Sequence, residues 1–131
     1  AVMKIVALTL GLVAFSSGAQ AGWSLVGASD TTSYYVDLGT VRKKGIFTRM
    51  WSLYNYAEPI FGKDGEQYSS SIMHVEYDCS EERSKRLFTS VYKKPMGEGS
   101  ALTLKHSTPA WGPIPPGTAI ELQWKLACDQ R

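Results

Sequence analysis

The sequence predicts an α+β fold, in which a C-terminal α-helix packs on one face of an antiparallel β-sheet and is tied to it by a disulfide. Residues 69–79 alternate between apolar and polar side chains with the period of a strand. Residues 119–129 follow a helix-start signal and carry an apolar stripe. Cys79 and Cys128, the only cysteines, lie one in each segment, so a bond between them joins strand to helix.

Residues 1–21 are predicted to be a cleaved signal peptide, including residual start residues 1–2. A short basic start precedes an apolar run at residues 5–15, and residues 19–21 match the A-x-A cleavage pattern. A membrane anchor is the alternative, but the run is shorter than the ~20 residues needed to cross a bilayer. Export places the protein in the periplasm or outside the cell, and no membrane anchor is expected after signal cleavage.

Residues 22–131 are expected to form a single small domain. Without Lys4, which is the only charged residue of the signal, 13 basic residues remain against 12 acidic ones, a net charge of +1. This balance gives no electrostatic footprint for nucleic acid. The basic run at residues 42–44 is expected to be a solvated turn. Nucleic acid is therefore not an expected partner.

Two chemistries are open to the two cysteines. Together with His74 and His106 they have the ligand types of a tetrahedral zinc site. Structural zinc sites usually bring their ligands in close pairs such as C-x2-C, and this sequence has none. Because an exported chain with an even number of cysteines more often forms disulfides, the Cys79–Cys128 disulfide is favoured and no metal is expected.

Between the signal and the last helix, the chain is predicted to be mostly strands, marked by β-branched and aromatic residues. Residues 37–41 predict a single helical turn with Asp37 as its N-cap. Pro59 and two glycines predict a polar loop that reaches Gln67. The predicted strands are residues 23–28, 33–37, 46–56, 69–79, 85–93 and 101–105.

The strand at residues 69–79 has two faces, because alternate side chains of a strand point in opposite directions. The apolar-rich set is predicted to face the core, and the set that contains one histidine and two carboxylates is predicted to face water. The core set is Ser71, Met73, Val75, Tyr77 and Cys79, and the solvent set is Ile72, His74, Glu76 and Asp78.

The predicted helix at residues 119–129 begins with the S/T-x-x-E form of a capping box. In this motif Thr118 accepts a hydrogen bond from the backbone N–H of Glu121, and Glu121 reaches back to the N–H of Thr118. Four residues recur at the spacing i, i+4, i+7 and i+8 and so form one apolar stripe. The stripe consists of Ile120, Trp124, Ala127 and Cys128.

A series of short motifs runs along residues 22–131 in a fixed order. In the first half these are Trp23, YYVD at 34–37, Arg42 before a glycine turn, and WSLYNY at 51–56. In the second half they are SSS at 69–71, EYDC at 76–79, a basic run at 83–86, PMG at 95–97, WGP at 111–113, PG at 116–117 and Cys128. In this order the motifs resemble the surface-adhesin E family of small exported Gram-negative proteins.

The resemblance implies an antiparallel sheet with a C-terminal helix held by a disulfide, in agreement with the residue patterns. It also implies dimerisation and, for some members, adhesion to host extracellular proteins. A lipid-anchored adhesin needs a cysteine directly after its signal, and this chain has none there. A soluble periplasmic protein is therefore at least as consistent with the sequence as display on the cell surface.

No catalytic constellation is predicted. His74 beside Glu76 has the composition of a general base with its orienting group, but a surface histidine next to a carboxylate is the favoured interpretation. The chain lacks the G-x-S-x-G, P-loop and G-x-G-x-x-G motifs. Basic residues follow directly after Asp78, Glu81 and Glu82, so this acidic group is expected to be a salt-bridged turn and not a metal site. Neither an enzyme activity nor a cofactor is expected.

The predicted function is that of a non-enzymatic exported binding protein, whose partner is another protein or a second copy of the chain. The alternative is a periplasmic carrier or sensor of a small ligand, which needs an enclosed apolar pocket of about 300 Å³ or more. Aromatic side chains are the candidates for the binding surface, because Tyr and Trp are enriched at interface hot spots. The candidate residues are Tyr34, Tyr54, Tyr56 and Trp111.

Overall fold

The computed structural model describes residues 22–104, 106 and 108–129 of the chain. The predicted signal peptide at residues 1–21 lies outside the described residues. Within the described part, no helix is long and apolar enough to cross a membrane.

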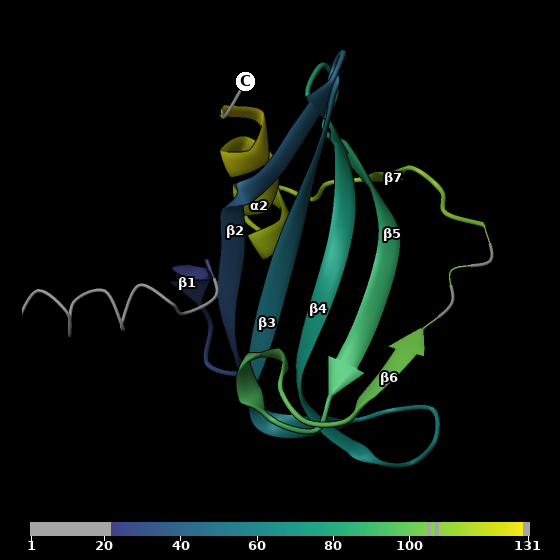
Figure 1. Cartoon of the computed structure of the whole chain (residues 1–131). Coiled ribbons are helices and arrows are strands. Elements are labelled where there is room, and N and C mark those ends of the chain that lie inside the picture. Colours follow the sequence, from purple (N-terminus) through teal and green to yellow (C-terminus); the bar gives the residue numbers. More distant parts are fainter. Residues whose placement is uncertain (1–21, 105, 107, 130–131) are drawn as a thin grey trace, which may run out of the picture.

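In the described part of the chain, the fold consists of one antiparallel sheet and one α-helix (Figure 1), and the predicted fold class is confirmed. The strands lie in the order β1-β2-β3-β4-β5-β6, so neighbours in the sheet are neighbours in the sequence, and β7 also pairs with β5. The helix α2 (Ala119–Asp129) packs against β2, β3 and β4. The strands are β1 (Ser24–Ala28), β2 (Thr32–Lys44), β3 (Phe47–Phe61), β4 (Gln67–Asp78), β5 (Arg83–Tyr92), β6 (Ala101–Leu104) and β7 (Gly112–Pro113), and η1 (Pro95–Gly97) is a 3-10 turn.

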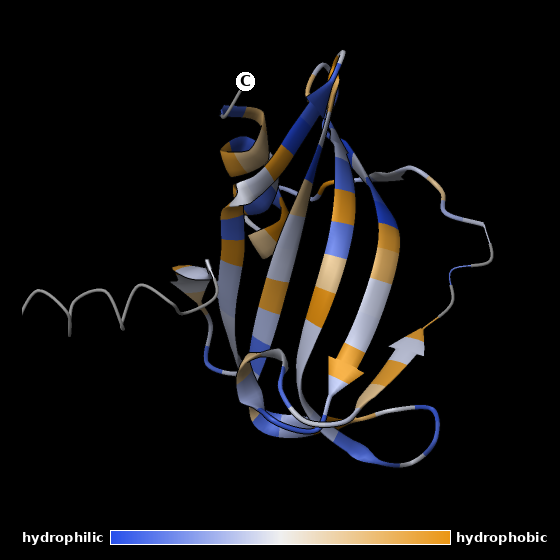
Figure 2. Ribbon diagram, in the orientation of Figure 1, coloured by the Kyte–Doolittle hydropathy of each residue, from blue (hydrophilic) through white to orange (hydrophobic). Residues whose placement is uncertain are grey.

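The hydrophobic core lies between α2 and the face of the sheet that this helix covers, which we call the inner face. Hydrophobic and polar residues alternate along the strands (Figure 2), as expected for a sheet whose two faces have different surroundings. The core set predicted for residues 69–79 is confirmed for Met73, Val75 and Tyr77, which are nearly inaccessible to solvent. The buried cluster consists of Val36, Met50, Met73, Val75, Tyr77, Ile114, Ala127 and Cys128.

The helix begins and ends where the sequence predicts, at residues 119 and 129. Thr118 Oγ1 accepts a hydrogen bond from the N–H of Glu121 at 3.4 Å, as the capping box requires. The carboxylate of Glu121, however, accepts from the N–H of Gly117 at 3.0 Å and not from that of Thr118. The predicted reciprocal bond is therefore shifted by one residue, and it still satisfies a free N–H group at the start of the helix.

The disulfide joins Cys79, directly after β4, to Cys128 in the last turn of α2, as predicted. The two Cα atoms are 5.6 Å apart, although 49 positions separate the residues in the sequence. A second link lies one turn earlier, where Trp124 Nε1 donates to the carbonyl oxygen of Asp78 at 2.8 Å. Both contacts hold the helix against the same end of β4.

Gln123, a buried polar residue on α2, makes a third link between helix and sheet. Its Nε2 donates to Tyr54 Oη at 3.0 Å, and its Oε1 accepts from Tyr77 Oη at 3.3 Å. Gln123 is 1% exposed, so water cannot replace it as a partner. Sequence periodicity assigned only apolar residues to this side of the helix and did not identify Gln123.

Replacement of Gln123 by leucine is expected to lower the free energy of unfolding by about 2 kcal/mol, because the buried hydroxyl groups of Tyr54 and Tyr77 each lose a hydrogen bond to the amide. Urea titration followed by circular dichroism measures the change. Lys125→Ala, at an exposed position on the same helix, is the control and should change stability by less than about 0.5 kcal/mol. A Gln123→Leu variant as stable as the wild type would show that the amide bridge contributes nothing.

Residues 37–41 belong to β2, and the predicted helical turn is wrong. The register between β2 and β3 shifts between Asp37 and Arg42, so these residues form an irregular stretch within a strand. Thr40 Oγ1 donates to the carbonyl oxygen of Asp37 at 2.6 Å and accepts from the N–H of Trp51 at 3.1 Å. The side chain thereby replaces missing ladder bonds, and a local turn forms without a helix.

The polar loop predicted to begin near Pro59 is shorter than expected, because β3 continues to Phe61. The register between β3 and β4 shifts between Asn55 and Ile60, and pairing resumes at Ile60 with Tyr68. Pro59 lies within this irregular stretch, where the N–H that proline lacks is not needed for the ladder. The connection between the strands is thus confined to residues 62–66.

The predicted solvent face of residues 69–79 is wrong for its two carboxylates. Glu76 is 7% exposed and Asp78 is 1% exposed. The antiparallel register places Lys85 opposite Glu76 and Arg83 opposite Asp78, and the long basic side chains cover the acids. Their N–O distances are 3.4 Å and 2.8 Å respectively.

The face of the sheet opposite α2, which we call the outer face, is covered at one end by η1. The N–H of Met96 donates to Asn55 Oδ1 at 2.8 Å, and that of Gly97 donates to Ser70 Oγ at 2.9 Å. Gly97 has a φ of +71°, and a Cβ at this position would lie 2.6 Å from Ile72 Cδ1. The turn needs glycine here, and beyond it no helix formed by the described residues covers the outer face.

Candidate functional site

The three tyrosines predicted to bind a partner lie on the inner face beside α2. The rings of Tyr34 and Tyr54 meet edge to face with centroids 4.9 Å apart. Tyr56 Oη lies 2.7 Å from Ser71 Oγ. All three tyrosines are half-buried, and these contacts give them a packing role.

Trp111, the fourth predicted residue, lies on the outer side, so the four do not form one surface. Its ring stacks on that of Phe47 with centroids 5.3 Å apart. The charged groups of Arg83 and Lys85 each lie 4.7 Å from the Trp111 ring centroid, within the range of cation–π attraction. Trp111 thus covers the end of the outer face that the turn η1 does not reach.

Between these two ends, three aromatic rings form a row across the outer face. Trp51, His74 and Phe88 occupy directly opposite positions on β3, β4 and β5. The rings of Trp51 and His74 stack with centroids 4.3 Å apart and planes 5° from parallel, and Phe88 approaches Trp51 at 5.5 Å with its plane tilted by 65°. We call these residues the aromatic row, and all three are half-buried and half-exposed.

A row of charges runs next to the aromatic row, at a distance of two residues along β3 and β4 and of three residues along β5, where the register shifts. Arg42, Arg49, Glu76 and Lys85 lie opposite one another on β2, β3, β4 and β5. Glu76 accepts from Arg49 Nε at 3.0 Å and is 3.4 Å from Lys85 Nζ, whereas the side chain of Arg49 remains 48% exposed. We call these four residues the basic row, and the two rows together the aromatic–basic surface.

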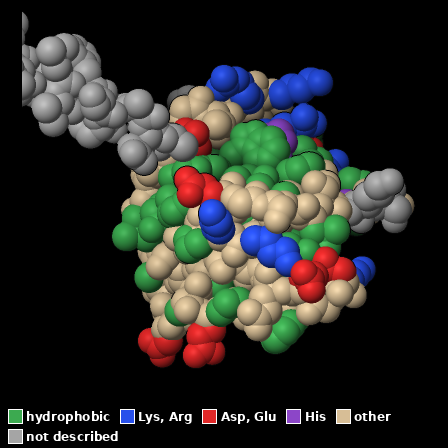
Figure 3. All heavy atoms as spheres, turned by 60° about the horizontal axis from the view of Figure 1, so that its bottom comes forward, with side chains coloured by type: hydrophobic (Ala, Val, Ile, Leu, Met, Phe, Trp, Pro, Cys, Tyr) green, Lys and Arg blue, Asp and Glu red, His purple; other side chains and the backbone are tan. Residues whose placement is uncertain are grey.

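Hydrophobic side chains gather on the molecule next to a histidine, with Lys and Arg side chains beyond them (Figure 3). An apolar area bordered by charge is the composition expected of a recognition surface.

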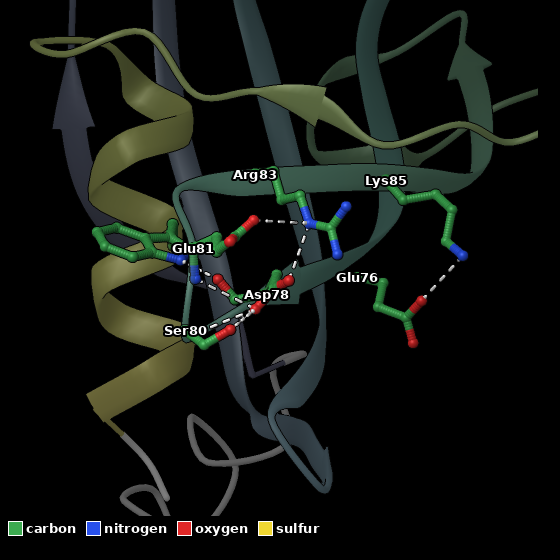
Figure 4. A network of polar contacts seen from close by, with 7 residues as sticks. Glu76, Asp78, Ser80, Glu81, Arg83 and Lys85 are labelled. Atoms are coloured by element: carbon green, nitrogen blue, oxygen red, sulfur yellow. Dashed lines mark hydrogen bonds and ion pairs between the residues drawn. The ribbon is translucent and has the colours of Figure 1, made fainter.

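A polar network fixes the turn after β4 beside the basic row (Figure 4). Asp78 accepts from the N–H groups of Ser80 and Glu81 at 2.9 and 3.2 Å, from Ser80 Oγ at 2.7 Å and from Arg83 Nε at 2.8 Å. Burial raises the pKa of Asp78, but the hydrogen bonds from Ser80 and Arg83 outweigh this effect and the pKa falls to about 2. Asp78 and Glu81 pair with Arg83 at 2.8 and 3.9 Å, so the predicted salt-bridged turn is confirmed for these two acids, although Asp78 is buried and not solvated.

The two histidines lie in separate places and neither hydrogen-bonds a carboxylate among the described residues. Burial lowers the pKa of His74, the charge of Arg49 lowers it further, and Glu76 opposes this shift. Glu76 is bound to Arg49 and Lys85 and does not orient His74 as a general base would require. His106 Nε2 lies 2.9 Å from Thr89 Oγ1.

A groove of about 510 Å³ lies at the end of the sheet near the β1–β2 turn. Its walls combine polar residues such as Asp30 and Glu58 with apolar ones such as Pro59 and Ile60, and it is open to solvent. A carrier or sensor of a small apolar ligand needs an enclosed site. This groove is not enclosed.

The sequence did not identify Trp51, Phe88 and Arg49 as site residues. Strand alternation could have placed Arg49, Trp51, Leu53 and Asn55 on one face of β3. It could not have shown that His74 and Phe88 lie directly opposite Trp51, because that depends on the register of three strands. A bulge between Phe88 and Arg86 shifts this register by one residue.

Comparisons with known proteins agree with this fold. The model of the surface-adhesin protein E family matches residues 23–129. Crystal form II of Haemophilus influenzae protein E is similar with a TM-score of 0.67 at 15% identity, over 84% of this chain and 89% of that chain. Protein E from non-typeable Haemophilus influenzae is similar with a TM-score of 0.63 at 13% identity, over 84% and 77%. No curated protein sequence matches the chain. Because the family model spans most of its length, the chain belongs to the surface-adhesin protein E family.

Proposed function

We propose that this chain is a non-enzymatic, exported binding protein that docks on another protein through the aromatic–basic surface. The observation that carries the proposal is the aromatic row, in which Trp51, His74 and Phe88 lie side by side on the face opposite the helix. The family to which the chain belongs is that of surface-adhesin protein E. A host extracellular protein, or another protein of the cell envelope, is therefore the expected class of partner.

The composition of the surface supports a protein partner. Aromatic residues and arginine are enriched at protein–protein interfaces, and Trp and Arg are common among the residues whose truncation weakens binding most. Trp51 and Arg49 are two residues apart on the same face of β3. Their half-exposed side chains are supported by neighbours on β4 and β5, so little side-chain entropy is lost on binding.

The Cys79–Cys128 disulfide supports a location outside the reducing cytosol. Cell-surface, periplasmic and secreted locations share this property. The proposed function needs only that the surface meets its partner in an oxidising compartment.

Phe88→Ala is expected to weaken binding to extracellular-matrix proteins about tenfold or more, because it removes an aromatic anchor from the aromatic row. The measurement is surface plasmon resonance with a panel of purified matrix proteins and the exported, disulfide-bonded protein. Circular dichroism confirms that the variant is folded.

Phe61→Ala is the matched control. Phe61 is 70% exposed and lies at the far end of β3, away from the aromatic row. This variant is expected to bind as the wild type does. If Phe61→Ala lost binding and Phe88→Ala kept it, the docking surface would lie at the other end of the sheet. If the folded wild type bound no matrix protein, adhesion to this class of partner would be rejected.

A further inference from the structure

We propose that the aromatic–basic surface takes an acidic, extended segment of a partner polypeptide. A carboxylate of this segment lies against Arg49, Trp51 and His74, and an apolar side chain of the same segment lies on Phe88. This inference rests on the proposed function and adds the chemistry of the partner. Its basis is the free hydrogen-bond donors, the net charge, the orientation of the rings and the length of the two rows.

Several donors on this surface have no acceptor within the described part of the chain. Arg49 donates Nε to Glu76, and its two terminal nitrogens make no hydrogen bond to the described residues. The indole N–H of Trp51 and the ring N–H of His74 likewise have no acceptor among the described residues, in which both side chains make ring contacts. A carboxylate accepts several such bonds at once and pairs with an arginine through two parallel bonds.

The net charge of the basic row favours an acidic partner. Three cations lie in this row with one carboxylate, Glu76, which is already paired with two of them. The row therefore carries a formal charge of +2, as much as the whole chain. Asp37 lies on β2 opposite Trp51, beside the aromatic row, and its carboxylate accepts a hydrogen bond from the N–H of Gly39 at 3.1 Å. Complementary charge of this kind speeds encounter and selects partners.

The orientation of the rings favours a polypeptide over a sugar chain. Trp51 and His74 are stacked on each other with planes 5° apart, so each covers a ring face of the other. A sugar ring would need such a face for stacking. The ring edges, which carry the N–H groups, are left for hydrogen bonds to a carboxylate.

The length of the surface fits a short extended segment. The basic row crosses from β2 to β5, which is three strand spacings or about 14 Å. Four extended residues reach about 14 Å. Alternate side chains of such a segment point to the same side, so two of them reach the surface, one acidic and one apolar.

A soluble random copolymer of glutamate and tyrosine is the probe, with polyglutamate and heparin as comparisons. We expect the whole oxidised protein to bind the copolymer and Arg49→Gln to bind it about tenfold or more weakly. Lys125→Gln removes a charge of the same sign from an exposed position of α2 and should leave binding unchanged. Trp51→Phe keeps the ring but removes the N–H, and should weaken binding severalfold. Isothermal titration calorimetry at two salt concentrations measures each affinity, and higher salt should weaken wild-type binding.

Different results overturn the inference in different ways. Equal copolymer binding by Arg49→Gln and Lys125→Gln would remove Arg49 from the site. Tighter binding of heparin than of the copolymer would assign the surface to an anionic polysaccharide. Self-association that Arg49→Gln abolishes would assign it to a second copy of the chain. Absence of copolymer binding, with matrix-protein binding that is sensitive to Phe88→Ala, would reject the acidic segment and leave the proposed function standing. Absence of both would reject both.

Discussion

Loss of the Cys79–Cys128 disulfide is expected to lower the free energy of unfolding by about 4 kcal/mol. The bond closes a loop between residues 49 positions apart, and the chain-entropy model gives about this value for a loop of that length. For a domain of this size the melting temperature should fall by roughly 15–25 °C. Thermal unfolding of the Cys79→Ser/Cys128→Ser double variant, followed by circular dichroism, measures the effect.

Reduction of the wild type provides an independent version of the same experiment. The reduced wild type and the double variant should melt at the same temperature, and reductant should not change the melting of the double variant. An unchanged melting temperature in both cases would show that the bridge does not hold the helix to the sheet. The hydrogen bonds of Trp124 and Gln123 would then be sufficient to hold the helix against the sheet.

Asp78→Ala is expected to lower the free energy of unfolding by about 3 kcal/mol. The carboxylate is 1% exposed and accepts bonds from Arg83, Ser80 and the backbone of Glu81. Its removal leaves two backbone N–H groups and a guanidinium without their buried partner. Urea titration near neutral pH measures the loss. Glu82→Ala, at an exposed position in the same turn, is the matched control and should be close to neutral.

The same carboxylate predicts how stability depends on pH. The pKa of Asp78 is lowered to about 2 in the folded protein, against about 4 in an unfolded chain. A carboxyl group whose folded pKa is depressed stabilises the protein fully above its unfolded pKa. This stabilisation is lost as the pH falls from about 5 to 2.

The free energy of unfolding, measured across this pH range, should fall more steeply with decreasing pH for the wild type than for Asp78→Ala. The difference between the two proteins should narrow as the pH falls. If the two plots of unfolding free energy against pH were parallel, the pKa of Asp78 would not change on folding. Its contribution to stability would then be independent of its charge.

Local signals predicted the helix and the disulfide correctly. The capping residue Thr118, the apolar stripe and the cysteine in it all lie within a dozen residues, so their geometry follows from one helical period. Cys79 follows a strand whose inward set was correctly read from alternation. These features needed no knowledge of what lies across the sheet.

The outer face could not be predicted in the same way. Alternation groups Ile72, His74, Glu76 and Asp78 on one side of β4, but it does not show what covers that side. Arg83 and Lys85 bury the carboxylates only because β4 and β5 pair in one register. The irregular stretch at residues 37–41 depends on Thr40 reaching Trp51 in the next strand. Each of these errors concerns a contact between neighbouring strands, and such a contact depends on the register in which the two strands pair.

In the central strands, alternate residues have different roles: one set packs in the core against the helix, and the other set lies on the outer face. On β3, Met50 and Ser52 are buried against the helix side, whereas Arg49 and Trp51 face the opposite way. A substitution at Arg49 or Trp51 changes the chemistry presented to a partner without altering the core between the sheet and the helix. Relatives that share this fold at only 13–15% identity can therefore diverge in what they contact while keeping one scaffold. Because the helix packs on the inner face alone, residues of the outer face can change without disturbing its packing.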